Sequence, residues 1–146
     1  MTTPTQYKVT ARAGTGDPAV VDTGTTTLSV DSTWGGKPPL PGPAELLASA
    51  FAACLLKNLA RTQDLMAFEY DGAEVEVIAR RQDSPPKFVE VAYTLRVTTA
   101  EPQRRVDLVH RNLRRYGTVY NTLAAVCDVH GDLIPVRPAR VGAAAP

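Results

Sequence analysis

The stretch AELLASAFAACLLKNLARTQDL, residues 44–65, decides the fold class, because it is a long helical segment set between β-prone ones. It contains neither glycine nor proline and is long enough for about six turns of α-helix. Its first half is apolar on nearly all sides, as expected of a helix that several neighbours bury. The apolar part is shorter than the ~20 residues that span a bilayer, so we expect a central core helix and no membrane segment.

Short strands are predicted upstream of this helix. Alternation of apolar and polar residues begins at Tyr7 and predicts a half-buried strand. Residues 19–31 hold two further β-prone runs, separated by a turn near residues 22–24. Glycines and prolines mark residues 32–43 as a loop.

Downstream of the helix the chain predicts a hairpin, two more helices and a last strand. Two alternating runs, residues 73–83 and 88–99, are joined by the segment SPPK and are expected to pair antiparallel. Residues 101–116 return to helical spacing, Gly117 interrupts it, and a shorter helix follows. Residues 130–136 are predicted as an edge strand, because the proline within them cannot donate to a ladder.

The resulting order, βββ–α–ββ–αα–β, predicts a single α+β domain with antiparallel sheet over residues 1–146. We expect the ordered core to cover about residues 7–137 and the C-terminal tail to be flexible.

Composition argues against several function classes. Sixteen basic and fifteen acidic side chains nearly cancel, so no bulk charge points to nucleic acid or to a membrane surface. The N-terminal segment is polar and lacks the apolar region of a secretory signal, and two cysteines are too few for a disulfide framework. The cytoplasm is the location we expect.

Cys54, in the middle of the long helix, is the main candidate for chemistry. On a helical wheel Phe51 and other apolar residues lie above it on its face, whereas Lys57, Arg61 and Asn58 lie below. A nearby cation favours the thiolate, which is the nucleophilic form. The alternative is a cysteine that fills space between helices, with Lys57 and Arg61 at the solvent end of the helix. Spacing alone leaves both interpretations open.

The other candidate residues have weaker support for a chemical role than Cys54. Cys127 is predicted to be an isolated structural thiol, because sequence does not bring it within disulfide reach of Cys54. A stripe of arginines on the helix at residues 101–116 is predicted to be a solvated face. The two histidines have no metal-ligand spacing around them, so we predict no metal and no cofactor. The residues concerned are Arg104, Arg111, Arg115, His110 and His130.

Three stretches together resemble the osmotically inducible protein C (OsmC) family, whose relatives include the organic hydroperoxide resistance proteins. They are LSVDSTWGGKPPLPGPAELLASAFAACLL at residues 28–56, VEVIARRQDSPPKFVEVAYTLRV at residues 75–97, and YGTVYNTL at residues 116–123. The first is similar to the family's strand, glycine pair, proline-bearing loop and cysteine-carrying helix. Order and spacing agree over about residues 7–137.

The resemblance implies an intertwined homodimer, in which antiparallel sheets of both chains wrap around two central helices. It also implies thiol-dependent reduction of organic hydroperoxides, with Cys54 at the peroxidatic position. In that chemistry the thiolate attacks the peroxide and becomes a sulfenic acid. A second cysteine condenses with it to a disulfide, and an external dithiol restores the enzyme.

Three positions depart from the family's pattern. Gly117 stands where the family has its resolving cysteine, so an external thiol, or Cys127 brought close by the dimer, would have to replace it. The family's loop arginine is missing, with Arg12 as its nearest substitute, and its glutamate falls one residue before Glu45. The resemblance thus predicts the fold but leaves the two-cysteine site incomplete.

Three functions follow as hypotheses. The first is a hydroperoxide reductase that uses Cys54, supported by Glu45, Arg12, Lys57 and Arg61. The second is a non-catalytic dimer that binds a small lipophilic ligand in an apolar cleft formed by two aromatic residues. The third is a structural or stress-induced dimer without a ligand. The aromatic residues of the second hypothesis are Phe51 and Trp34, which would also bind the substrate's alkyl group in the first.

Overall fold

The computed structural model describes residues 3–36 and 39–139, and its elements follow the predicted order βββ–α–ββ–αα–β. The predicted tail beyond residue 139 lies outside the described residues. Contacts divide the chain into two units, residues 1–47 and 48–146, and each is described by itself.

Unit 1 contains a three-stranded antiparallel meander, β1 (Thr10–Arg12), β2 (Ala19–Asp22) and β3 (Thr27–Val30). Gly24 takes a left-handed conformation, with φ +94°, in the predicted turn between β2 and β3. The half-buried strand expected from Tyr7 is wrong, because the side chain of Tyr7 is 87% exposed and all three residues of β1 are exposed. Strands of three or four residues bury too little surface to cover such side chains.

Unit 2 is built on a second three-stranded sheet, β4 (Gly72–Asp83), β5 (Pro86–Thr98) and β6 (Asp128–Val136), in the order β4-β5-β6. The hairpin of β4 and β5 is antiparallel and β6 is an edge strand, both as predicted. The fully antiparallel sheet is not observed, because β6 pairs parallel with β5. Two helices connect these strands, and a crossover of this kind brings the chain back in the same direction.

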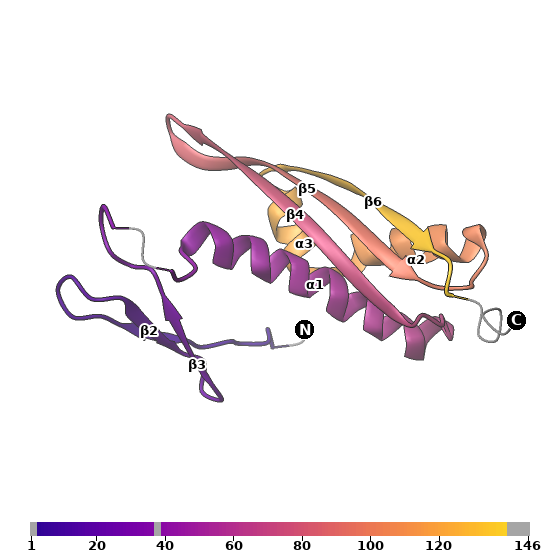
Figure 1. The fold of residues 1–146 in the computed structure, drawn as a ribbon, viewed down its shortest axis with the longest axis horizontal. Coiled ribbons are helices and arrows are strands. Elements are labelled where there is room, and N and C mark those ends of the chain that lie inside the picture. The colour runs from indigo at the N-terminus through magenta and orange to yellow at the C-terminus, as the bar shows by residue number, and fades with distance from the viewer. Residues whose placement is uncertain (1–2, 37–38, 140–146) are drawn as a thin grey trace, which may run out of the picture. The chain divides into compact units, whose positions relative to one another are not determined.

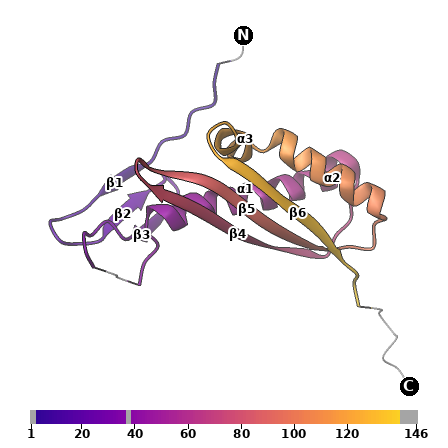
Figure 2. The same cartoon turned by 90° about the horizontal axis from the view of Figure 1, so that it is seen from above.

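The helices α1 (Pro43–Met66), α2 (Gln103–Tyr116) and α3 (Thr118–Ala124) complete the fold, and in unit 2 they lie on one face of the sheet (Figures 1 and 2). Alternation along β5 supplies the apolar face that they cover. The core side chains from the sheet and helices include Val91, Tyr93, Leu95, Val97, Leu133, Phe51, Leu55, Leu59, Val106, Val109, Leu113, Tyr120 and Leu123.

The junction of α2 and α3 is formed by Gly117, which ends the first helix and caps the second, as the sequence predicts. Tyr116 continues the helical spacing of the buried residues Val106, Val109 and Leu113, but its own side chain is 48% exposed. It lies in the last turn, and its ring contacts the guanidinium groups of Arg61 and Arg115, at 5.2 and 5.3 Å from the ring centroid.

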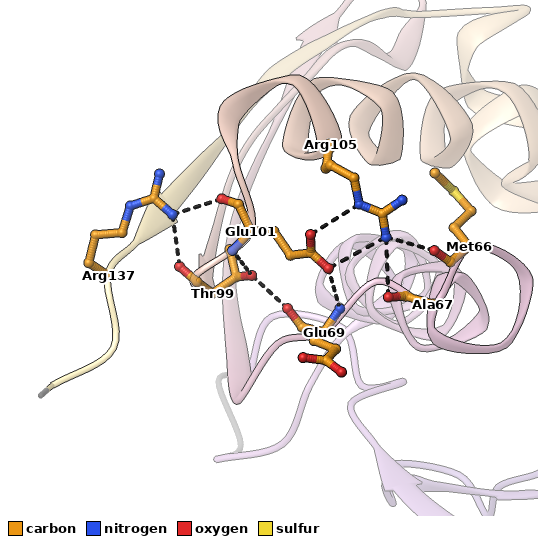
Figure 3. A network of polar contacts seen from close by, with 7 residues as sticks. All are labelled: Met66, Ala67, Glu69, Thr99, Glu101, Arg105 and Arg137. Carbon is orange, nitrogen blue, oxygen red and sulfur yellow. Dashed lines mark hydrogen bonds and ion pairs between the residues drawn. The ribbon is translucent and has the colours of Figure 1, made fainter. Parts of the chain in front are cut away.

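The C-terminus of α1 is capped by side chains from other elements (Figure 3). Arg105 of α2 donates from Nη2 to the carbonyl oxygens of Met66, at 2.7 Å, and Ala67, at 3.2 Å. Its Nε donates to Glu101 at 3.0 Å, and Glu101 in turn accepts from the backbone N–H of Glu69. These bonds satisfy carbonyls that a helix end leaves without intrahelical donors.

The central helix is less covered than predicted. Among the described residues α1 alone is long and apolar enough to cross a membrane by length and composition, a test that core helices of soluble proteins also pass. Only 17% of its most apolar window is buried. One side packs into the core through Phe51, Leu55 and Leu59, whereas Ala53 and Leu56 are exposed on the other.

Candidate functional site

Cys54 is a half-buried thiol in the middle of α1. Its polar neighbour is Asn58, one turn further along the same helix. The amide Nδ2 of Asn58 donates to the sulfur of Cys54 at 3.5 Å and to its carbonyl oxygen at 2.9 Å. An N–H group directed at sulfur stabilises negative charge there. Asn58 lies four residues after Cys54 and therefore on the same face of the helix. The spacing alone does not indicate a role for it in the site.

Gly117 brings the α2–α3 junction against this sulfur. A Cβ atom built on Gly117 would lie 3.3 Å from the Sγ of Cys54, 3.0 Å from the carbonyl oxygen of Leu113 and 2.9 Å from the Cβ of Tyr120. The backbone at this position is ordinary, with φ −72°, so the glycine serves close approach and not an unusual conformation. The position that the family resemblance assigns to a second cysteine therefore adjoins the Cys54 thiol.

An aromatic cluster lies on the core side of the site. The Phe51 ring stacks on Tyr120 and meets Tyr93 at a tilt, with both centroid separations 5.7 Å. Tyr93 and Tyr120 meet edge to face at 6.0 Å. Phe51 is fully buried in the core one turn before Cys54, and its role as a substrate-contacting side chain stays a prediction.

Tyr93 of the aromatic cluster forms a neutral polar pair with His110. Tyr93 and His110 share a hydrogen bond of 2.7 Å between the tyrosine hydroxyl and Nε2. Burial raises the pKa of Tyr93 far above its usual range. Burial, and then the positive charge of Arg114, lower the pKa of His110. Both side chains are therefore neutral at neutral pH, and the cluster stays uncharged.

The predicted cations of α1 are exposed. Lys57 faces solvent, and the guanidinium of Arg61 lies over the ring of Tyr116. Arg61 therefore makes a cation–π contact with α2. Asn58 is the residue on this helix face that contacts the sulfur.

Three predicted site residues belong to unit 1. Arg12 ends β1, and Glu45 is the acidic residue of the first turn of α1. Trp34, in the loop before that helix, is fully exposed. Their catalytic and substrate-binding roles stay predictions.

Cys127 lies between α3 and β6, three residues after the last residue of the helix. Its thiol donates to the backbone carbonyl of Phe88 at 3.3 Å, and both cysteines of the chain are free. Cys127 thus contacts the start of β5 and Cys54 contacts the α2–α3 junction. A role for Cys127 as second thiol stays a prediction.

Of the two histidines, His130 lies in a group of side chains that its local sequence spacing did not predict. His130 stands beside Glu90 of the neighbouring strand and Asp128 of its own, and these three side chains are close enough to hold a metal ion. Local spacing does not predict this group, because Glu90 is brought in by strand pairing.

The arginine stripe agrees with its prediction, since Arg104, Arg111 and Arg115 are all exposed.

The site as a whole defines an α+β protein with a helix-borne thiol held against a glycine at a helix junction. The sequence model described as OsmC-like protein matches residues 35–130, about two thirds of the chain. The chain therefore belongs to the OsmC-like protein family, as the resemblance indicated.

Solved structures share this fold. The OsmC-like protein of Mycoplasma pneumoniae has a TM-score of 0.79 and 16% identity, over 90% of this chain and 99% of that one. An organic hydroperoxide resistance protein OsmC of Legionella pneumophila has a TM-score of 0.71 and 16% identity, over 91% and 99%. The organic hydroperoxide resistance protein OhrB of Bacillus subtilis has a TM-score of 0.62 and 21% identity, over 88% and 98%. No curated protein matches the sequence.

Proposed function

We propose that this chain is a one-cysteine peroxidase that reduces organic hydroperoxides through Cys54 and serves protection against oxidative stress. The observation that carries the proposal is the place of Gly117, where the family resemblance puts a second cysteine: a Cβ there would lie 3.3 Å from the Cys54 sulfur. Two of the structural relatives are named for organic hydroperoxide resistance, which supports the same class of substrate.

The chemistry proceeds from the thiolate of Cys54. It attacks one oxygen of the peroxide, the O–O bond breaks, and the leaving alkoxide takes a proton to become an alcohol. The cysteine sulfur is thereby oxidised to sulfenic acid. The Nδ2 amide of Asn58 stabilises the thiolate before attack. The neutral aromatic cluster around Phe51 gives the site an apolar side, which suits an alkyl-bearing substrate.

Resolution requires a thiol from outside the site, because Gly117 supplies none. A first external thiol condenses with the sulfenic acid, forms a mixed disulfide and releases water. A second thiol attacks the mixed disulfide, frees Cys54 and leaves as an external disulfide. A dithiol reductant performs both steps. Free thiols and this reductant fit a reducing compartment such as the cytoplasm.

The proposal includes a homodimer in which the exposed side of α1 is covered by a second copy. Ala53 and Leu56 are exposed in the single chain, on a helix that the resemblance places at the dimer centre. Burial of such apolar surface favours association. Arg12, Glu45, Lys57 and Trp34 would then contribute to the site from either copy.

The test is oxidation of the reduced protein by cumene hydroperoxide, followed by rapid thiol titration and mass spectrometry. The wild type and Cys127→Ser should lose one thiol rapidly, with a mass increase of one oxygen on Cys54. Cys54→Ser should react no faster than a small free thiol. Serine is nearly isosteric with cysteine, so both variants are matched in packing.

Two results would redirect the proposal. Dependence of rapid turnover on Cys127 as well would identify that residue as a second thiol. A wild-type rate equal to that of a free small thiol would reject peroxidase activity. The remaining candidate would then be a non-catalytic dimer that binds a small lipophilic ligand near Phe51 and Trp34.

A further inference from the structure

We propose that the outer face of the β5–β6 pair binds one divalent transition-metal ion, of the Zn²⁺ type, through Glu90, Asp128 and His130. The site is separate from Cys54 and does not depend on the peroxidase proposal. The three side chains come from two neighbouring strands of one sheet.

Strand register brings the three ligands together. Glu90 of β5 lies directly opposite Asp128 of β6 in the parallel pair. His130 follows Asp128 by two residues and so projects from the same face of the sheet. This face is directed away from the helices, since the alternate residues of β5, such as Val91 and Tyr93, are buried beneath them. The ligands are thus held by paired strands and not by loops.

The ligand atoms are already near coordination distance from one another. Nε2 of His130 lies 3.1 Å from Oε2 of Glu90 and 4.0 Å from Oδ2 of Asp128. All three ligand atoms lie within 4.8 Å of each other. Ligands at about 2.0–2.1 Å around a tetrahedral Zn²⁺ are about 3.4 Å apart. Small side-chain rotations of the two carboxylates therefore suffice to form the site.

Arg80 orients the central carboxylate. Its Nε lies 2.7 Å from Oε1 of Glu90, whereas Oε2 is directed to His130. An outer partner of this kind fixes a ligating carboxylate in metal sites. Glu90 and Asp128 bring two formal negative charges to the ligand set, which suits a dication.

The donor set indicates the class of metal. One imidazole and two carboxylates suit Zn²⁺, Co²⁺ or Ni²⁺ better than Mg²⁺ or Ca²⁺, which prefer oxygen ligands alone. Three protein ligands leave a fourth position for water or an external ligand. In a metal-free chain the same contact is a surface hydrogen bond between His130 and Glu90, and the experiment distinguishes this hydrogen bond from a metal site.

The experiment is calorimetric titration of the tag-free full chain with Zn²⁺, in a Cys54→Ser/Cys127→Ser background that removes zinc binding by thiols. We expect one Zn²⁺ per chain, and with Co²⁺ the visible absorption of a four-coordinate site. His130→Ala and Glu90→Gln should each weaken binding by about tenfold or more. Glu76→Gln, which removes an exposed acid from β4 on the same sheet, is the matched control and should bind as the parent does.

Thermal unfolding with and without Zn²⁺ gives a second readout, because an ion that binds only the folded chain raises Tm. The increase should be lost in His130→Ala and kept in Glu76→Gln. Saturable binding that His130→Ala leaves unchanged would overturn the proposal, and so would the absence of saturable binding up to millimolar Zn²⁺.

Discussion

Gly117 lies where any side chain would contact the sulfur of Cys54 and the Cβ of Tyr120. The absence of a Cβ therefore lets the α2–α3 junction pack closely against the thiol. Glycine also has no Cβ to which the sulfur of a second cysteine could be bonded. In the peroxidase that we propose, this residue is the reason why the sulfenic acid needs an external thiol.

We predict that Gly117→Cys restores a resolving thiol. A Cβ at this position would lie 3.3 Å from the Sγ of Cys54, and a disulfide places the Cβ of one cysteine about 3 Å from the sulfur of the other. One equivalent of hydroperoxide should therefore give an intramolecular Cys54–117 disulfide, detectable by mass spectrometry of non-reduced peptides.

Gly117→Ser is the control, because it carries a similar steric load without a thiol. Both variants should lower the free energy of unfolding by about 1–3 kcal/mol, since the added Cβ meets Tyr120 at 2.9 Å and must displace it. A folded Gly117→Cys protein that stays a sulfenic acid after peroxide treatment would show that the geometry is not suited to resolution.

We predict that His110 makes stability fall in mild acid. Burial lowers the pKa of His110 in the folded state, so between the lowered value and the ordinary value of 6.5 the unfolded chain binds more protons. The stability that this residue contributes is present above pH 6.5 and is lost as the pH falls through the lowered pKa.

Urea unfolding between pH 7.5 and about 5.5 measures this effect, above the range in which ordinary carboxylates titrate. His110→Gln should flatten the pH dependence of the unfolding free energy. The other histidine gives the control, because His130→Gln removes an exposed ring and should leave the part due to His110 in place. An equal slope in wild type and His110→Gln would contradict the prediction.

At the scale of elements, α1 ends without a basic residue in its last turn, and its terminal carbonyls are satisfied from α2. Ala67, directly after the helix, has φ 49°, a left-handed conformation that is uncommon for a residue other than glycine. Arg105 holds this turn, and Glu101 holds Arg105 (Figure 3). The end of the helix that carries Cys54 is therefore fixed by tertiary contacts.

We predict that Arg105→Ala lowers the free energy of unfolding by about 1–3 kcal/mol, because it leaves the partly buried carbonyl oxygen of Met66 and the exposed one of Ala67 without a charged donor. Urea denaturation measures the change. Arg104→Ala is the matched control, since Arg104 is the adjacent exposed arginine of α2, and its effect should stay within about 0.5 kcal/mol. Equal midpoints for the two variants would mean that Arg105 does not cap α1.

At the scale of the whole molecule, α1 is a long apolar helix that one chain covers on one side only. Leu56 is 37% exposed on the uncovered side, together with the alanines around it. An apolar helix face of this kind in a soluble protein is commonly covered by a partner. The homodimer that we propose supplies that partner.

We predict that Leu56→Asp weakens the homodimer by about thirtyfold or more, because a charge replaces an apolar contact at the centre of the interface. Light scattering coupled to size-exclusion chromatography over a range of concentrations measures the dissociation. Ile78→Asp is the control, since Ile78 is 48% exposed but belongs to β4. A wild-type chain that is monomeric at all concentrations would reject the dimer.

The order of the elements could be predicted from the sequence because each signal is local. The breaker-free run of α1, the alternation in β4 and β5, and the interruption at Gly117 act within a few residues. The direction of β6 relative to β5 could not be predicted, because it depends on how α2 and α3 cross the sheet. The burial of Phe51 and the exposure of Tyr116 depend on neighbours from other elements in the same way.

In the candidate sites, too, some features follow from local sequence patterns and others depend on contacts between distant residues. The sequence by itself determined that Cys54 stands on a mostly apolar helix with Asn58 one turn away, since helical periodicity is a property of neighbouring residues. Only the tertiary structure decided that Gly117 adjoins the sulfur, and that Glu90 joins Asp128 and His130. These contacts join residues far apart in the chain, and their distances are set by helix packing and strand register, which no local pattern encodes.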